Sequence, residues 1–422
     1  MIFNSGQWRW GLRAAGPLLA LGLILGPGPV RADNAEAPEA ALVEMVRQGW
    51  LREQGHGGPK NEAEAAIWYQ RAAEAGQPTA QFSLANLYRD GRGVPQDDKA
   101  ALKWYLAAAE QGLTPAQFNL AWMYDAGRGA PPDPTQAFRW YLKAAEGGDP
   151  AAKANVGAMY LDGRGVPANP PRAWKWLREA ADQGLPLAQA NLGRFYDQGL
   201  GLVAGGPAAA ARWYRPAAEA GVAMAQNNLG YLCLKGQGVP RDYRQAFKWF
   251  CLAAAQGEIE AFHNLGLMFR DGFGVKPRRD LAEAFLKRAA EGGLEASQAS
   301  LGRLYETGAD PNYKEALRWY RLAAARKEPQ ACNYLGVLYE YGRGVPQNHG
   351  EAARWYRYAA DRDHPAACHN LGRLYEDGLG LPRDFYEAAH WYGRAAGLGD
   401  GVARRRLEAL IKAGLIPDRG GS

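Results

Sequence analysis

Residues 80–112 read AQFSLANLYRDGRGVPQDDKAALKWYLAAAEQG, and this stretch decides the fold because variants of it recur along the chain. A tryptophan followed by an aromatic residue marks each recurrence. These pairs, or their substitutes, begin at Trp68, Trp104, Trp140, Trp176, Trp213, Trp249, Phe285, Trp319, Trp355 and Trp391. The successive separations are 36, 36, 36, 37, 36, 36, 34, 36 and 36 residues. A period of this length is typical of repeat proteins.

Each period predicts two helices. In the first helix, Leu84, Ala85 and Tyr88 fall on one helical stripe, and Gly91 followed by Pro95 predicts its end. The second helix is expected to start seven residues before the tryptophan, where Asp and Asn are favoured because their side chains accept free backbone N–H groups. These predicted N-cap residues are Asn61, Asp97, Asp133, Asn169, Asp242, Asn312, Asn348 and Asp384.

One pair of short helices cannot bury its apolar stripe alone, whereas stacked pairs can. The sequence therefore predicts an all-α fold, a right-handed α-solenoid of about ten helix-turn-helix repeats of 36 residues. We assign residues 33–400 to this solenoid and residues 401–422 to a C-terminal capping helix and tail, with Val402–Lys412 as the amphipathic cap. The repeated tryptophans are expected in the core.

The first 32 residues have the features of a secretory signal. Arg9 and Arg13 precede an apolar run of 12 residues from Ala14 to Leu25, and Ala32 ends a small-residue cleavage site. A helix of that length spans about 18 Å, against roughly 30 Å for a bilayer core. We predict cleavage near Ala32 and a periplasmic or secreted chain without stable membrane insertion. An uncleaved anchor is the alternative.

Composition and motifs narrow the function classes. Hydrophobic residues make up 47% and charged residues 22%, as in ordinary globular proteins. The formal net charge is +6, and Arg9, Arg13 and Arg31 of the first segment contribute to it, which argues against a nucleic-acid-binding protein. No G-x-S-x-G, H-E-x-x-H or Walker sequence occurs. We therefore expect no catalytic residues, no enzyme activity and no cofactor.

The two helix signatures together resemble the Sel1-like repeat, a relative of the tetratricopeptide repeat. Two units carry the resemblance through Tyr160, Gly163, Gly165 and Val166, and through Leu335, Gly336, Tyr339, Gly342, Gly344 and Val345. The resemblance covers nearly all of the chain after residue 32. It implies an adaptor, and exported bacterial members are linked to cell-envelope assembly, exopolysaccharide secretion and signalling.

The chain has four cysteines, Cys233, Cys251, Cys332 and Cys368. Secreted cysteine-rich members of the family link a second helix to the next first helix through a disulfide. Ala324 and Ala360 occupy the upstream positions here, so the resemblance implies that this disulfide is absent. Buried free thiols are predicted, with an exposed Cys251, and a Cys233–Cys251 bridge is the alternative.

A histidine-rich segment near the C-terminus raises the question of a metal site. It contains His364, Cys368, His369 and His390. A metal requires its ligands to converge on one ion, but adjacent residues on a helix point about 100° apart. We predict no metal site.

Three features depart from the repeat. The loop Gly199–Pro207 has one extra residue, and the loop Glu306–Tyr313 is two residues short. Pro216 falls inside a second helix, where it removes a backbone hydrogen bond. Neutral drift explains these departures, or they bend the superhelix and shape a binding bay. Both interpretations predict altered curvature near the fifth and eighth units.

One column of the first helices carries amides, just before the repeated Leu or Val. Its members are Asn119, Asn155, Asn191, Asn228, Asn264 and Asn370. In the related tetratricopeptide fold this position faces the concave groove, where amides bind a peptide backbone. The alternative is that each amide satisfies a buried polar group of the adjacent unit.

Neighbouring columns vary and supply candidates for specificity: Phe118, Trp122, Arg194, Tyr231, Arg303 and Arg373. Aromatic residues and arginines are frequent interface hot spots, and arginines bind carboxylates. Ordinary solvated surface is the alternative.

We predict a non-enzymatic adaptor or scaffold of the cell envelope that binds peptides or proteins through the concave face. A cell-wall-fragment or β-lactam-binding, hydrolase-like protein is the alternative implied by some exported relatives. A convergent buried cluster in a pocket would favour that alternative, whereas an open groove lined by amides, aromatics and arginines favours the adaptor.

Overall fold

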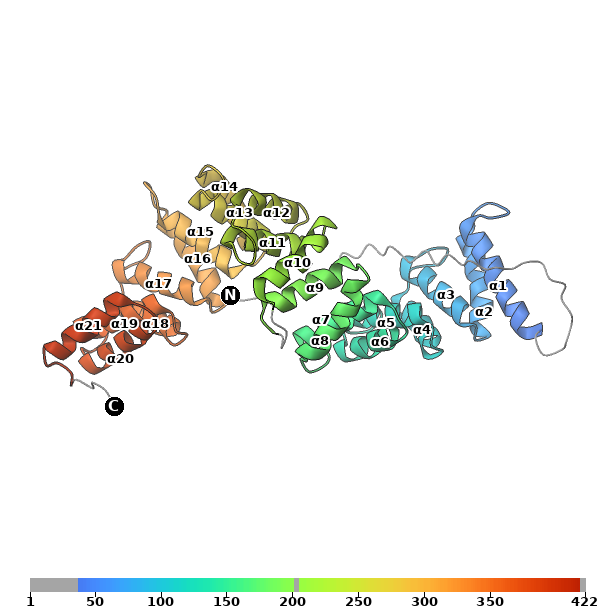
Figure 1. The fold of residues 1–422 in the computed structure, drawn as a ribbon, viewed down its shortest axis with the longest axis horizontal. Coiled ribbons are helices and arrows are strands. Elements are labelled where there is room, and N and C mark those ends of the chain that lie inside the picture. The colour runs from blue at the N-terminus through green and yellow to red at the C-terminus, as the bar shows by residue number, and fades with distance from the viewer. Residues whose placement is uncertain (1–36, 201–204, 418–422) are drawn as a thin grey trace. The chain divides into compact units, whose positions relative to one another are not determined.

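The computed structural model describes residues 37–200 and 205–417, and every regular element in these ranges is an α-helix (Figure 1). The first helices of the units are α1 (Ala37–Gln54), α3 (Pro78–Asp90), α5 (Thr114–Ala126), α7 (Pro150–Asp162), α9 (Pro186–Asp197), α11 (Ala223–Lys235), α13 (Ile259–Asp271), α15 (Glu295–Glu306), α17 (Pro329–Tyr341) and α19 (Pro365–Asp377). The second helices are α2 (Glu62–Glu74), α4 (Asp98–Glu110), α6 (Pro134–Glu146), α8 (Pro170–Asp182), α10 (Gly206–Glu219), α12 (Tyr243–Ala255), α14 (Arg279–Glu291), α16 (Tyr313–Ala325), α18 (His349–Ala360) and α20 (Phe385–Gly397). A last helix, α21 (Gly401–Lys412), follows them.

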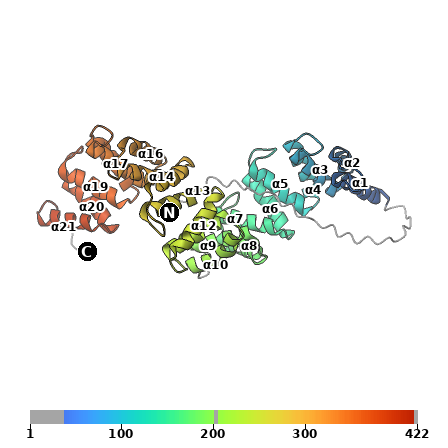
Figure 2. The ribbon, with the colours of Figure 1, turned by 90° about the horizontal axis from the view of Figure 1, so that it is seen from above.

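The chain forms two compact units, one ending at Ala108 and one beginning at Ala109. In the first compact unit, α1 packs on α2 and α2 packs on α3. In the second, each helix from α5 to α21 packs on the next in chain order (Figure 2). The predicted all-α repeat architecture is confirmed. The signal-like residues 1–32 lie outside the described residues, and none of the described helices is long and apolar enough to cross a membrane.

The predicted helix ends are also confirmed. At all eight predicted N-caps the side-chain oxygen accepts backbone N–H groups of the first turn. Asp133, for example, accepts from Thr135 and Gln136 at 3.0 Å. Most first helices end on a left-handed glycine such as Gly342, whose φ is 66°, whereas α9 and α15 end on Gln198 and Thr307 with negative φ. Short-range chemistry therefore places the helix boundaries.

The core consists mainly of alanines and of the aromatic residue that follows the tryptophan. Tyr214 and Tyr356 are 0% exposed. The prediction that the tryptophans form the core is only partly right. Trp140, Trp319 and Trp391 are buried, but the remaining tryptophans of this column are half-buried. Their outer faces are positioned for contact with cations, as where the Arg178 guanidinium lies 5.2 Å from the Trp213 ring centroid.

The sequence departures have local structural consequences. Pro216 lies within α10, which continues through it to Glu219. The short loop after α15 is held by Arg279, whose guanidinium donates to the carbonyls of Leu304 and Thr307. The predicted loop Gly199–Pro207 includes residues 201–204, which lie outside the described residues.

The C-terminal helix α21 closes the core of the last unit. Asp400 caps it by accepting from the backbone N–H groups of Val402 and Ala403. Ala403 and Leu410 are buried, whereas Arg404 to Arg406 are exposed. The helix thus has one apolar face and one solvated face, as expected of a terminal cap.

Candidate protein-binding face

The first helices of the second compact unit form a common face. Helices α7 and α9, α9 and α11, and α11 and α13 contact each other directly, in addition to their contacts with second helices. In a curved stack, elements that approach their equivalents in neighbouring units lie on the inner side. We call this surface the first-helix face; it is the surface that the sequence analysis expects on the concave side.

Close packing between the two helices of a unit determines which residues reach this face. A Cβ atom at Gly193 would lie 2.6 Å from Cδ1 of Tyr214, and one at Gly302 would lie 2.5 Å from Cε1 of Tyr320. Only glycine or a small residue admits the tyrosine ring there. The residues on either side of this glycine are consequently held close to the second helix.

Buried tyrosines of the second helices bind carboxylates on the first-helix side, an arrangement that we call the tyrosine–acid column. The tyrosine hydroxyl donates to a glutamate of the same unit in the pairs Tyr69–Glu53, Tyr320–Glu306, Tyr356–Glu340 and Tyr392–Glu376, at 2.6–2.8 Å. Burial, followed by the negative charge of the glutamate, raises the pKa of Tyr356 far above its usual range. These hydroxyls therefore act as permanent donors.

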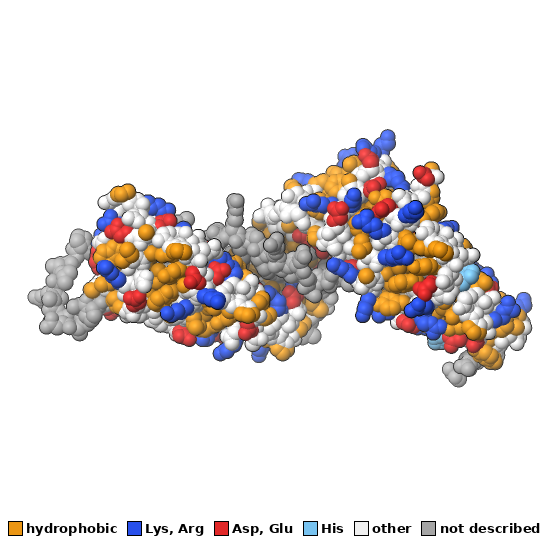
Figure 3. All heavy atoms as spheres, turned by 180° about the vertical axis from the view of Figure 1, so that it is seen from behind, with side chains coloured by type: hydrophobic (Ala, Val, Ile, Leu, Met, Phe, Trp, Pro, Cys, Tyr) orange, Lys and Arg blue, Asp and Glu red, His pale blue; other side chains and the backbone are white. Residues whose placement is uncertain are grey.

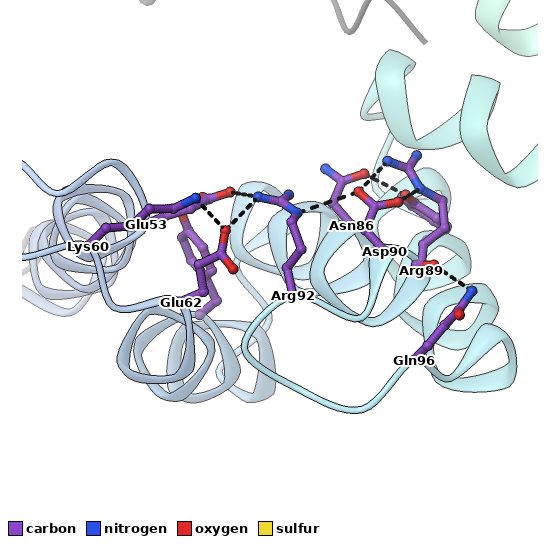
Figure 4. A network of polar contacts seen from close by, with 10 residues as sticks. Glu53, Lys60, Glu62, Asn86, Arg89, Asp90, Arg92 and Gln96 are labelled. Atoms are coloured by element: carbon purple, nitrogen blue, oxygen red, sulfur yellow. Dashed lines mark hydrogen bonds and ion pairs between the residues drawn. The ribbon is translucent and has the colours of Figure 1, made fainter. Parts of the chain in front are cut away.

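Arginines from the following unit neutralise the same acids. Figure 4 shows Arg92 beside Glu53, Glu62 and Asp90, and its Nη1 lies 2.9 Å from Oε1 of Glu53. The other pairs that involve these acids are Arg343–Glu306, Arg373–Glu340 and Arg406–Glu376. Arg164 pairs in the same way with a further acid, Asp125. These arginines compensate the charge of the carboxylates within the chain.

The tyrosine–acid column was not predicted, although the sequence contains a signal for it. Units with the second-helix tyrosine carry an acid 14 or 16 residues earlier, as in Tyr356–Glu340 and Tyr320–Glu306. Repeats without the tyrosine hydroxyl also lack the acid 16 residues earlier. The residue at the acid position and the residue at the tyrosine position are Leu161 and Leu177, Leu234 and Phe250, or Arg270 and Leu286. There are two exceptions, Tyr105 and Tyr214, where Arg89 and Gln198 stand at the position of the acid. The Tyr105 hydroxyl donates to Oδ1 of Asn86, and the Tyr214 hydroxyl accepts from the Asn228 amide.

The amide column divides into two groups. Three of its members are engaged inside the chain: Asn264 donates to Asn227 at 2.9 Å, Asn370 donates to Asn333 at 3.1 Å, and Asn228 donates to the Tyr214 hydroxyl at 3.1 Å. Among the described residues, the side chains of the other three members have no hydrogen-bond partner; these are Asn119, Asn155 and Asn191. Asn191 is buried, whereas Asn119 and Asn155 are half-buried and reach the surface.

The aromatic candidates lie at the surface beside the free amides or further along the face. Phe118 packs edge-on against Tyr141 at a centroid distance of 5.4 Å. Trp122 is half-buried, with the Arg128 guanidinium 5.5 Å from its ring centroid. Tyr231 is half-buried, with the Lys235 ammonium 5.6 Å from its centroid. Each of the three rings therefore keeps part of its area accessible, and Trp122 and Tyr231 do so beside a cation.

The arginine candidates differ from one another. Arg194 is buried and forms an ion pair with Asp162 at 3.0 Å. Arg373 forms an ion pair with Glu340. Arg303 is exposed, and its guanidinium carbon lies 5.1 Å from the Tyr334 ring centroid. The structure thus engages Arg194 and Arg373 internally and leaves Arg303 at the surface.

The cysteines and histidines lie in separate local environments. The four cysteines are free thiols, and Cys251 is half-buried rather than exposed as predicted. Sγ of Cys368 lies 3.7 Å from the Ala360 carbonyl, a position that in other units is taken by a glutamine amide, as in Gln226 to Ala218 at 3.0 Å. His364 caps α19, and His369 lies 3.2 Å from Asp400. No group of three potential metal ligands converges within the described residues.

Two hollows open on second helices rather than on the first-helix columns. One is lined by Lys314, Leu317, Arg318, Arg321 and Leu322 of α16. The other is lined mainly by residues of α10, including Trp213 and Pro216, together with Arg178 and Tyr196. Neither lining includes a carboxylate or a serine or cysteine nucleophile.

The sequence pattern of the Sel1 repeat matches residues 46–77, 78–113, 114–149, 150–185, 186–222, 223–258, 259–294, 296–327, 329–364 and 365–400. The chain belongs to the Sel1 repeat family. The matched repeats divide the chain at the boundaries between successive helix pairs, so each Sel1 repeat corresponds to one structural unit.

Solved Sel1 repeat structures resemble the chain. The protein c5321, a protective antigen present in uropathogenic Escherichia coli strains that displays an SLR fold, is 32% identical over 90% of this chain and 82% of its own, with a TM-score of 0.75. A Sel1 repeat protein from Oxalobacter formigenes is 33% identical over 58% of this chain and 99% of its own, with a TM-score of 0.49. The comparison with curated proteins gives no match.

Proposed function

We propose that the protein is a non-enzymatic adaptor of the cell envelope that binds extended segments of other proteins along the first-helix face. The observation that carries this proposal is the pair of accessible amides, Asn119 and Asn155, beside Phe118 and Trp122 on α5 and α7. A side-chain amide both donates and accepts, so it matches the backbone of an extended peptide. The aromatic side chains add apolar area and supply hot-spot contacts.

The proposed envelope location rests on residues 1–32, which carry the charge and hydrophobicity pattern of an export signal. We expect the full chain to be exported into the periplasm or the medium and to be shortened near Ala32. Cell fractionation and N-terminal sequencing test this step separately from binding. A full-length protein retained in the cytoplasm would contradict the location without affecting the proposed binding face.

Affinity capture from an envelope extract tests the binding proposal. The full chain is immobilised beside an Asn119→Ala/Asn155→Ala variant, and retained proteins are identified by mass spectrometry. A partner held by the parent and lost by the variant supports the adaptor. The matched control is Asn312→Asp/Asn348→Asp, which removes two amides from N-cap positions where aspartate caps equally well. The proposal would be contradicted if the control variant lost the partner to the same extent, or if the parent protein retained no partner.

A further inference from the structure

Arg303 lacks the acidic partner that its counterparts in other units have. Arg373 pairs with Glu340, which lies 33 residues earlier, and Arg194 pairs with Asp162, which lies 32 residues earlier. The residues at the same two offsets from Arg303 are Arg270 and Asp271. The first is itself a cation. The second is engaged by it, with Arg270 contacting Asp271 through two hydrogen bonds of 2.7 and 2.8 Å.

The surroundings of Arg303 leave its charge uncompensated. Within the described part of the chain, its guanidinium has no ion pair or hydrogen bond, and it lies over the ring of Tyr334. The nearby acid Glu306 is already bound by the Tyr320 hydroxyl at 2.8 Å and by Arg343 at 3.5 Å. We call Arg270, Arg303 and Tyr334 the Arg303 site; together with Asp271 it carries one excess positive charge.

This excess is local rather than general. On the face drawn in Figure 3, basic and acidic side chains are interspersed. Arginines of the first-helix face and of the loops mostly neutralise an acid of the preceding unit, as Arg343 and Arg373 do. For Arg303, the position at which Arg373 finds its acid is occupied by a second arginine, Arg270. A cation held on a tyrosine ring, with its donors exposed, is suited to bind a carboxylate through two parallel N–H bonds.

We propose that the Arg303 site binds an aspartate or glutamate side chain of an extended acidic segment in a partner protein, an inference that rests on the proposed adaptor function. The planar guanidinium matches the two carboxylate oxygens, and the charge of Arg270 adds attraction without offering a competing acid. Ser300 stands in the amide column three residues from Arg303 and is half-buried. Its hydroxyl supplies a further donor or acceptor for the backbone of such a segment.

Fluorescence anisotropy with a fluorescein-labelled peptide of ten glutamates tests this inference on the full chain. We expect saturable binding, no binding of a ten-glutamine peptide, and at least about tenfold weaker binding by Arg303→Glu. Arg303→Gln should weaken binding by about fivefold, and it provides a second test if the charge reversal perturbs folding. The matched control is Arg354→Glu, a reversal at a 77% exposed side chain on α18, which should change affinity by less than about twofold.

Other outcomes would overturn the inference. If the glutamate peptide does not bind, the proposed site does not exist. If Arg303→Glu and Arg354→Glu weaken the affinity for this peptide equally, the binding is non-specific electrostatic attraction. Competition by polygalacturonate at the same carboxylate concentration would show that the site takes acidic polysaccharide instead of protein. The adaptor proposal is tested independently, because Asn119→Ala/Asn155→Ala acts on α5 and α7. Loss of a captured partner in that variant, without any effect of Arg303→Glu on the glutamate peptide, would remove this inference alone.

Discussion

At the scale of residues, the tyrosine–acid column explains which side chains must change together. The Tyr356 hydroxyl is buried and donates to Glu340, which is 3% exposed and also pairs with Arg373. An unsatisfied buried polar group costs about 1–3 kcal/mol. Replacing both the acid and the tyrosine of a repeat therefore costs less stability than replacing one of them. One repeat lacks both, with Leu234 at the acid position and Phe250 at the tyrosine position.

A double-mutant cycle on Glu340 and Tyr356 tests this coupling. Glu340→Leu should destabilise the protein by about 2–3 kcal/mol, because it leaves a hydroxyl and a guanidinium without their acceptor. Tyr356→Phe should cost about 1–2 kcal/mol. The double variant, which copies Leu234/Phe250, should lose at least about 1 kcal/mol less than the sum. Urea unfolding, with hydrogen exchange of α17 and α18 as a local readout, measures the cycle; additive losses would show that the two groups act independently.

At the scale of elements, helix boundaries follow from caps, whereas the interior of a helix tolerates one clear violation. Pro216 removes a backbone donor within α10, and the helix nevertheless continues for three more residues. Packing of Ala217 and Ala218, which are at most 1% exposed, stabilises this last turn. An interior proline costs roughly 3 kcal/mol in helices that lack such compensation.

Pro216→Ala should therefore stabilise the protein, by about 1–3 kcal/mol, because it restores the donor within α10. Thermal unfolding and the hydrogen-exchange protection of α10 measure the gain. Pro207→Ala is the matched control, since that proline lies in the first turn, where no donor is needed. An unchanged or lower stability of Pro216→Ala would mean that the ring contributes more through packing against its surroundings than it costs.

At the scale of the whole molecule, stability is the sum of units and of their contacts with neighbours. The helix α21 and the residues directly after it cover the core of the last repeat, α21 through Ala403 and Leu410 and the following segment through Ile416. Its role is consequently local, and damage to it should spread only into the adjacent helices.

Truncation after Asp400 tests this cap. We expect faster hydrogen exchange in α19 and α20, because Tyr392 and Ala395 lose their cover, and unchanged exchange in α5 to α8. The control is Arg404→Ala/Arg405→Ala, which alters only the exposed face of α21 and should leave exchange unchanged. Uniformly faster exchange along the chain would contradict nearest-neighbour stability.

The sequence was sufficient to predict the helix pairs, their caps and the repeat. Asp133 and Gly342 act through bonds to residues a few positions away, so their effects are readable in a short window. The availability of the binding residues was not predictable in this way. Asn264 and Asn155 occupy the same column, but only Asn264 has an amide acceptor in the preceding unit, at Asn227.

By itself, the sequence determined the all-α architecture of Sel1 repeats, because periodicity and capping are local and recur ten times. Only the tertiary structure decided which polar side chains form hydrogen bonds or ion pairs within the chain and which remain accessible to a partner. Arg194, Arg303 and Arg373 are the same residue in the same column, yet each one's availability depends on the residue about one repeat earlier. Stacking brings those distant positions within hydrogen-bonding distance, and the charge found there decides whether the arginine remains free.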